Sequence, residues 1–223
     1  MFLNRTDAGR QLGARLAAYR TQHPLVVGLP RGGVPVAAAV AKVLGAPLDV
    51  IVVRKLGVPY QPELAMGAVG EGGVVVVNEP ILAMAGVGRE VLDEMTRAEQ
   101  GVVEQRSLEL RRGRPAEPLG GRTVIVVDDG IATGSTARAA CEVARAHGAA
   151  HVVLAVPVAP PGWDGRLAGA ADERVSLSSP DPFYAVGQFY EDFSPTTDDE
   201  VVAALVSSMG GGDDGGPHND GPG

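Results

Sequence analysis

The chain is poor in cysteine, lysine and aromatic residues, and carries more acid than base. Cys141 is the only cysteine among 223 residues, so no internal disulfide can form. It falls on the apolar side of a predicted helix, which indicates a core thiol rather than a nucleophile. The net charge is −8, and the only basic cluster surrounds Arg111, Arg112 and Arg114. This balance argues against a nucleic-acid partner.

Long apolar runs are also missing. No segment is apolar for long enough to span a bilayer, and residues 1–7 lack the apolar core of a secretory signal. We therefore expect a cytoplasmic protein with no membrane partner. A hydrophobic fraction of 45% suits one globular domain, which we place at residues 1–208. Residues 209–223 are mostly Gly, Asp and Pro, and we expect a disordered tail there.

The most informative segment is Val124–Thr136, which reads VIVVDDGIATGST. An apolar strand ends in two carboxylates, and a Gly- and Thr-rich turn then leads into a helix. Unpaired N–H groups at such a turn and helix start bind phosphate well, and Ser135 and Thr136 add hydroxyl donors. Asp128 and Asp129 suit the hydroxyls of a ribose or a hydrated Mg²⁺. The run thus favours a site for ribose 5-phosphate.

A plainer interpretation treats Asp-Asp-Gly as a solvated turn and Ser135 or Thr136 as a helix cap. A lone Asp-Asp-Gly would support that interpretation, but the whole run makes it the weaker one. A Walker A loop is excluded because no Lys follows Gly134, and no G-x-G-x-x-G opens a helix here.

Strands and helices alternate along the chain. We expect strands at 25–29, 48–53, 74–77, 124–127, 151–157 and 173–177, and helices from Thr6 or Asp7 to His23 and at 34–44, 87–112 and 136–147. This order predicts an α/β fold with a parallel, doubly wound sheet, in which ligands bind beyond the carboxyl ends of the strands. The turn Arg31-Gly32-Gly33, the pair Arg54-Lys55 and the acidic pair are all expected at strand ends. Taken singly, the first is also compatible with a tight turn and the second with solvated charges.

The run at 124–136 resembles the phosphoribosyl pyrophosphate (PRPP) motif of type I phosphoribosyltransferases. Residues 28–55, GLPRGGVPVAAAVAKVLGAPLDVIVVRK, are similar to the pyrophosphate loop, helix and next strand of that family. The resemblance implies a mainly parallel sheet with a small C-terminal hood and, here, a helical insert at 87–114. It also implies a homodimer, and often a non-proline cis peptide in the pyrophosphate loop.

The resemblance also implies roles for individual residues. Catalysis would involve Asp128, Asp129 and Lys55, and Mg²⁺, the expected cofactor, would lie near Asp128, Asp129 and Glu191. In the hood segment 183–193, Tyr184 would stack on the base and Ala185 would offer backbone groups to its edge. The residues expected to bind PRPP are Arg31, Gly32, Gly33, Arg54, Lys55, Asp128, Asp129, Gly130, Ile131, Ala132, Thr133, Gly134, Ser135 and Thr136.

Residues 57–73 fall where the family keeps a mobile cover, and an ordinary hairpin is an equal alternative. The function implied is Mg²⁺-dependent transfer of ribose 5-phosphate from PRPP to a nitrogenous base, with release of pyrophosphate. The alternatives are a non-catalytic PRPP or nucleotide sensor and an interaction protein with a degenerate site. Ala132 stands where hypoxanthine-guanine enzymes have an Asp, so no general base is assigned and 6-oxopurines are expected to be poor acceptors.

Overall fold

A five-stranded parallel sheet forms the centre of the computed structural model, which describes residues 1–208. The strand order is β2-β1-β6-β7-β8, and each neighbouring pair is parallel. The predicted doubly wound sheet is therefore confirmed. The tail predicted at 209–223 lies outside the described residues. The strands are β1 (Leu25–Gly28), β2 (Leu48–Val50), β6 (Thr123–Val127), β7 (His151–Val158) and β8 (Glu173–Ser178).

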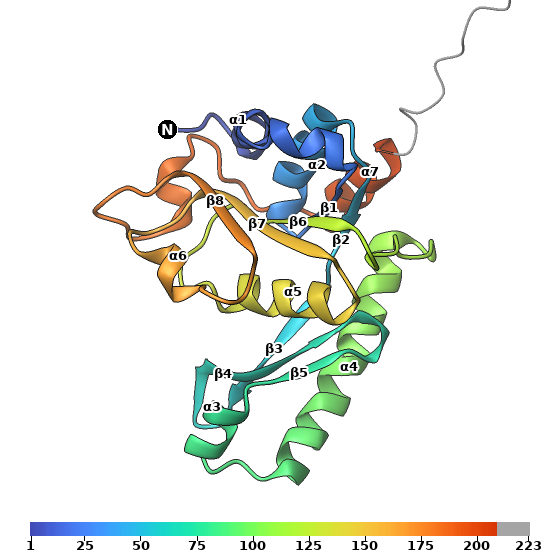
Figure 1. Ribbon diagram of the computed structural model, residues 1–223, viewed down its shortest axis with the longest axis vertical. Helices are drawn as coiled ribbons and strands as arrows, with labels where there is room; N and C mark the ends of the chain where they lie inside the picture. Colours follow the sequence, from blue (N-terminus) through green and yellow to red (C-terminus); the bar gives the residue numbers. More distant parts are fainter. Residues whose placement is uncertain (209–223) are drawn as a thin grey trace, which may run out of the picture.

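Helices cover both faces of this sheet (Figure 1). On one face, α1 (Arg5–Arg15), α2 (Gly33–Leu44) and α7 (Asp198–Ser207) pack over Ile125 and Val127. On the other face, α5 (Ser135–Ala146) and α6 (Trp163–Arg166) pack over Val124 and Val126. Burial on both faces explains why β1, β6 and β7 are almost continuously apolar. Three short 3₁₀ turns complete the body and its links: η1 (Ala17–Gln22), η2 (Glu71–Gly73) and η3 (Val186–Phe189).

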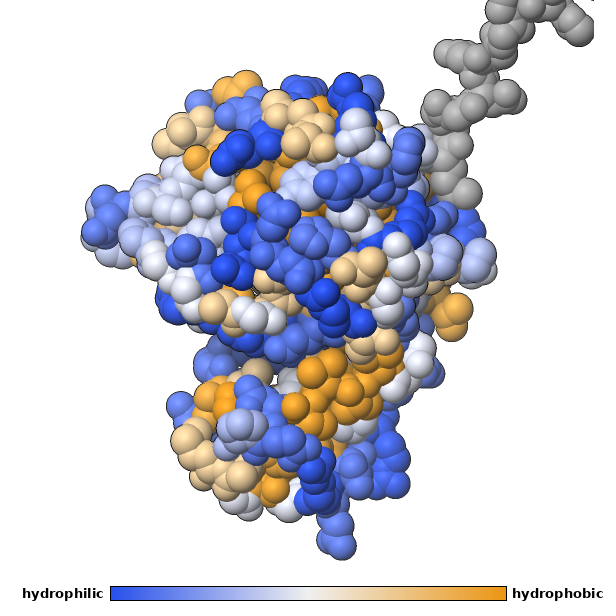
Figure 2. Space-filling model, in the orientation of Figure 1, coloured by the Kyte–Doolittle hydropathy of each residue, from blue (hydrophilic) through white to orange (hydrophobic). Residues whose placement is uncertain are grey.

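A second, antiparallel sheet forms a lobe that projects from the body below α5 (Figure 1). It contains β3 (Val53–Val58), β4 (Gln61–Gly70) and β5 (Val75–Val77), with α3 (Glu79–Met84) and the long α4 (Arg89–Arg111) beside it. Leu56, Met66 and Leu82 are buried in its own small core. The lobe's surface carries an apolar area in an otherwise largely hydrophilic view of the protein (Figure 2).

The lobe corrects three expectations. The loop expected at 56–73 is part of a hairpin, the alternative that the sequence had left open, the strand expected at 48–53 ends at Val50, and the strand at 74–77 is not part of the parallel sheet. The physical reason is that α3 and α4 supply an apolar surface for β3 and β4, whose alternating side chains can then be buried. The long helix predicted at 87–112 is confirmed as α4.

A buried ion network joins the lobe to the body. The Arg111 guanidinium donates from Nε to Asp49 Oδ1 at 2.8 Å and from Nη1 to Glu71 Oε2 at 2.5 Å. Its Nη2 donates to the Val50 carbonyl at 2.8 Å. A cavity of about 350 Å³ lies beside this network, and His147 on its wall hydrogen-bonds the Glu71 carbonyl at 2.9 Å. The polar groups facing this cavity thus form hydrogen bonds and ion pairs that connect the lobe to the body.

No helix within residues 1–208 is both long enough and apolar enough to cross a membrane. Three helices among the described residues were not predicted: α3, α6 and α7. A signal for α7 is present, since Thr197-Asp198-Asp199-Glu200 forms a capping box in which Thr197 and Glu200 bond each other's backbone N–H groups.

Candidate functional site

Two loops meet at the carboxyl ends of β1 and β6, which are neighbours in the sheet with Gly28 opposite Val127. A Cβ placed on Gly32 would lie 2.1 Å from Asp129 Oδ2, and one on Gly33 would lie 2.7 Å from the Val127 carbonyl oxygen. Only glycine permits this approach. The Pro30–Arg31 peptide bond is cis, a feature that the resemblance implied. The predicted pyrophosphate loop and the acidic pair therefore lie against each other.

The loop after the acidic pair leads directly into α5. Its start is anchored at Ile131, whose N–H donates to the Val158 carbonyl at 3.0 Å. Gly134 precedes the helix with φ of 85°, and no side chain of residues 1–208 caps the first turn. The first amide N–H groups of α5 are thus open to a ligand. The hydroxyls of Thr133 and Ser135 lie 3.2 Å apart beside them. This arrangement suits a phosphate dianion.

The acidic pair is electrostatically unusual. Asp128 accepts a hydrogen bond from the Asp129 N–H at 2.9 Å. Burial, together with the neighbouring Asp129 charge, raises the pKa of Asp128 well above its ordinary value. Burial also raises the pKa of Asp129, and the Arg5 guanidinium opposes that rise. A bound cation would relieve this repulsion.

The donor set fits Mg²⁺, which favours carboxylate oxygens and keeps several water or phosphate ligands. Within residues 1–208, however, no group of three or more His, Cys, Asp or Glu side chains is arranged to hold a metal ion. The carboxylate of Glu191 belongs to an exposed residue and is not gathered with Asp128 and Asp129. A Mg²⁺ ion would therefore be held by the acidic pair together with ligand oxygens.

Arg5 is a site residue that the sequence analysis missed. Its Nε donates to Asp129 Oδ2 at 2.8 Å, and the two side chains are only 12% and 15% exposed. No local pattern could have indicated this contact, because the partners are 124 positions apart in the chain. The pair is made only when α1 and β6 come together in the folded domain.

The three predicted pyrophosphate cations are placed differently. Arg31 directly precedes the Gly32-Gly33 turn and is half exposed, with its Nη1 3.9 Å from Asp198 Oδ1. Arg54 and Lys55 instead lie within β3 of the lobe, and not at the end of a strand of the parallel sheet. There Arg54 pairs with Glu99 at 2.8 Å and Lys55 with Glu63 at 2.9 Å. The structure thus brings Arg31 to the site edge and leaves the Arg-Lys pair in lobe contacts.

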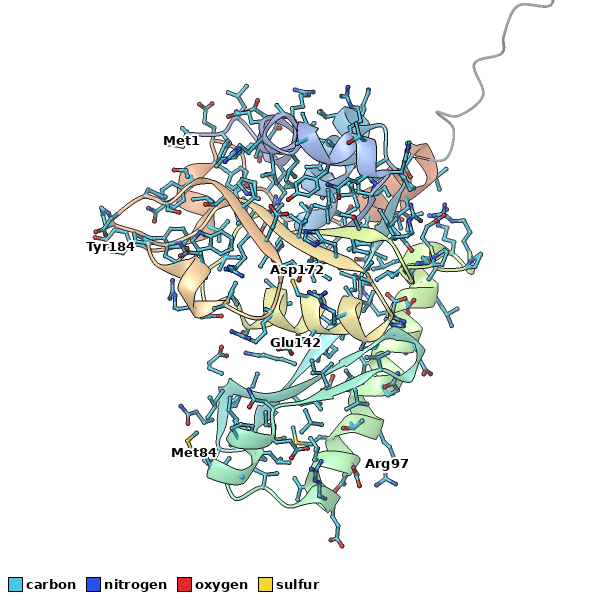
Figure 3. The ribbon with its side chains drawn as sticks, in the orientation of Figure 1. Met1, Met84, Arg97, Glu142, Asp172 and Tyr184 are labelled. Atoms are coloured by element: carbon cyan, nitrogen blue, oxygen red, sulfur yellow. The ribbon has the colours of Figure 1, made fainter. Side chains whose placement is uncertain are left out.

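The hood segment approaches the acidic pair through other residues than those expected. Tyr184 is 84% exposed, at the outer end of the loop after β8 (Figure 3). The Ala185 N–H donates within the hood to Gln188 Oε1 at 3.1 Å. By contrast, Tyr190 donates its hydroxyl to the Asp129 carbonyl at 2.6 Å, and a Cβ on Gly130 would lie 2.5 Å from Val186. The base-binding roles of Tyr184 and Ala185 stay predictions.

Cys141 is fully buried on α5 among apolar side chains. Burial raises the pKa of its thiol to about 12. Both observations agree with the expected core position of this residue.

Comparison with known proteins yields a consistent family. The phosphoribosyl transferase domain model matches residues 3–172. Proteins of Mycobacterium tuberculosis strains CDC 1551 / Oshkosh and H37Rv, both named "Putative phosphoribosyl transferase", are each 56% identical over 198 residues, or 89% of this chain and 45% of theirs. The chain thus spans about half the length of these relatives. The crystal structure of TT1426 from Thermus thermophilus is similar with a TM-score of 0.86 and 44% identity, covering 93% of this chain and 98% of that one. The chain belongs to the phosphoribosyl transferase domain family.

Proposed function

We propose that this domain binds PRPP with Mg²⁺ and transfers its ribose 5-phosphate to a ring nitrogen of a small base, releasing pyrophosphate. The observation that carries the proposal is the contact between the Gly32-Gly33 turn and Asp129, beside the uncapped start of α5. The proposed pyrophosphate, ribose and phosphate sites would thereby be adjacent, in the order in which PRPP presents these groups.

Each part has a role in the proposed reaction. The 5-phosphate would accept hydrogen bonds from the first N–H groups of α5 and from Thr133, Ser135 and Thr136. Asp128 and Asp129 would hold the ribose hydroxyls and favour the positive charge that develops at C1. The bond from C1 to the pyrophosphate oxygen would break as the bond from C1 to the acceptor nitrogen forms, and the proton of that nitrogen would pass to water or to the departing pyrophosphate. Mg²⁺ would supply charge neutralisation of the phosphates.

Arg31 would share in neutralising the leaving group. Its guanidinium is half exposed and only loosely paired with Asp198, so it can turn to an anion at the Gly32-Gly33 turn. Lys55 would take part only if it left Glu63 on the lobe. Catalysis in this account consists mainly of positioning and of charge stabilisation.

The residue at position 132 bears on which base can act as the acceptor. Ala132 is exposed in the phosphate loop and carries no acid that could handle a proton on the base. General acid–base help is typically worth about 10²–10⁴-fold in rate. We therefore expect hypoxanthine and guanine to be poor acceptors, even with a complete PRPP site.

A second candidate is a PRPP-binding regulator without turnover. The pairing of Lys55 with Glu63 and of Arg54 with Glu99 favours it, because a binding protein needs no lobe cation at the leaving group. Pyrophosphate release separates the two functions. PRPP, Mg²⁺ and a panel of nucleobases are incubated with the wild type and with Asp129→Asn.

Release that requires both a base and Asp129 supports the transferase. PRPP binding without release for any base supports the regulator. Absence of PRPP binding contradicts both candidates.

A further inference from the structure

We propose that Arg5 is a positioning residue that orients the Asp129 carboxylate toward the ribose hydroxyls. The inference rests on the proposed function and deepens it, since it makes the N-terminal segment part of the ribose site. The contact itself is short and shielded, with 2.8 Å between Nε and Oδ2 and little exposure of either side chain. A shielded charge pair is screened less by salt than an exposed one.

Arg5 is held on two further sides. Its Nη1 donates to the Ser194 carbonyl at 2.7 Å, and its Cζ lies 3.9 Å from the centre of the Phe193 ring. A guanidinium fixed by a carbonyl and an aromatic face has little freedom to turn. The direction of its Nε–H, and hence of the Asp129 oxygen that accepts it, is thereby set by Phe193 and Ser194 at the end of the hood segment.

The backbone of Asp129 is also held by a hydrogen bond. Tyr190 donates its hydroxyl to the Asp129 carbonyl at 2.6 Å, and its ring packs 5.0 Å from that of Phe193. Side chain and main chain of Asp129 are thus both held by groups outside its own loop. This double contact is what a carboxylate with a fixed direction requires.

The N-terminal strap, residues 1–5, fastens Arg5 to the hood by backbone hydrogen bonds. The Phe2 N–H donates to the Phe189 carbonyl at 2.8 Å, and the Glu191 N–H donates to the Phe2 carbonyl at 2.9 Å. The Asp192 N–H donates to the Leu3 carbonyl at 3.0 Å. The strap therefore carries Arg5 to the acidic pair in a defined register.

Occupation of Oδ2 by Arg5 leaves the other oxygen for a ligand. Among residues 1–208, no other side chain donates a hydrogen bond to the Asp129 carboxylate. Arg5 also adjoins the opposite loop, because a Cβ on Gly32 would lie 3.2 Å from its Nε. The guanidinium therefore lies at the junction of the two loops, where it turns the free oxygen of Asp129 toward the ribose.

The test compares ligands that differ in a ribose hydroxyl. Ribose 5-phosphate and 2-deoxyribose 5-phosphate are titrated calorimetrically with Mg²⁺ into the wild type, Arg5→Ala, Arg5→Lys and Arg10→Ala. Arg10 is an exposed arginine on the same helix and provides the matched control. PRPP is titrated into the wild type in parallel, and thermal unfolding shows whether each variant is folded.

We expect the wild type and Arg10→Ala to prefer the ribose compound by roughly tenfold or more, the value of a hydrogen bond to a charged acceptor. In Arg5→Ala the ratio of the affinity for ribose 5-phosphate to that for 2-deoxyribose 5-phosphate should approach one, and Arg5→Lys should restore part of the preference. In an Asp129→Asn background, Arg5→Ala should cause no further loss of the ratio.

An unchanged ratio in folded Arg5→Ala overturns the role of Arg5, even if its melting temperature falls. If Arg5→Ala does not fold, Arg5→Lys takes its place in the test. The role of Arg5 is then overturned if Arg5→Lys has the wild-type ratio of affinities for the two sugar phosphates and Asp129→Asn changes that ratio as much in Arg5→Lys as in the wild type. Failure of the wild type to bind PRPP overturns the proposed function instead, and the role of Arg5 with it.

Discussion

Gly32 and Asp129 occupy positions so close that a side chain on one would overlap the other. A Cβ at residue 32 would lie 2.1 Å from Asp129 Oδ2 and 2.9 Å from its Cγ. This contact joins the loop that follows β1 to the loop that follows β6, the central strand of the parallel sheet. It is a direct physical link between the predicted pyrophosphate and ribose sites.

The first prediction concerns this glycine. Gly32→Ala should displace Asp129 and the Arg5 guanidinium, costing about 1–3 kcal/mol of stability from overpacking and weakening PRPP binding. Gly101→Ala is the control, because Gly101 lies in α4 with open space around it and Ala favours a helix by roughly 0.5–1 kcal/mol. Chemical unfolding and calorimetry measure both variants. Equal PRPP affinity in Gly32→Ala and wild type would refute the close contact of the two loops.

The second prediction concerns the charge of Asp128 in the absence of ligand. Its pKa is raised in the folded protein, so the folded state binds this proton more tightly than the unfolded chain. The resulting penalty is complete above the folded pKa and disappears as pH falls toward the unfolded value of about 3.9. Asp128→Asn should therefore raise the melting temperature at pH 8, by about 2–4 °C for each 1 kcal/mol relieved.

The same gain should shrink steadily as the buffer is made more acidic. Asn can still accept the hydrogen bond from the Asp129 N–H, so the loop geometry is retained. Melting curves of wild type and variant from pH 4 to pH 8 provide the measurement. A variant that is less stable than wild type at pH 8 would show that the carboxylate is not under strain from burial.

The third prediction concerns the joint between lobe and body. Arg111→Met removes a buried cation and leaves Asp49 and Glu71 without it, which should cost about 3–5 kcal/mol. Arg97→Met, an exposed change on the same helix, should alter stability by less than about 0.5 kcal/mol. Urea unfolding compares the two. Similar stabilities of both variants would mean that the ion network does not hold the lobe.

The fourth prediction separates the expected pyrophosphate cations. Arg31→Ala should weaken pyrophosphate and PRPP binding by about 1.5–3 kcal/mol, and should affect a nucleoside monophosphate much less. Lys55→Ala should have a smaller effect on pyrophosphate than Arg31→Ala, because Lys55 is paired with Glu63 on the lobe. Calorimetric titration of the three ligands is the measurement. Equal losses for all three ligands in Arg31→Ala would place this residue elsewhere.

The sequence was sufficient where one local segment carries the whole signal. The run from Val124 to Thr136 predicts a strand, a phosphate loop and a helix, and β6 and α5 follow it. The lobe was less predictable, because β3 and β4 bury their side chains against helices that lie further along the chain. The role of Arg5 was not predictable at all, since it depends on a contact made only in the folded domain. Tyr190 was near the expected hood but reaches Asp129 by its hydroxyl, which the spacing of aromatic residues does not reveal.

The central claim is that the acidic pair and its two loops form a PRPP site. Calorimetric titration of PRPP with Mg²⁺ into the wild type and into a double variant with Asp128→Asn and Asp129→Asn tests it most directly. The account predicts saturable binding by the wild type and near-complete loss in a double variant that remains folded. Equal affinity of the two proteins, or no binding by the wild type, would contradict it.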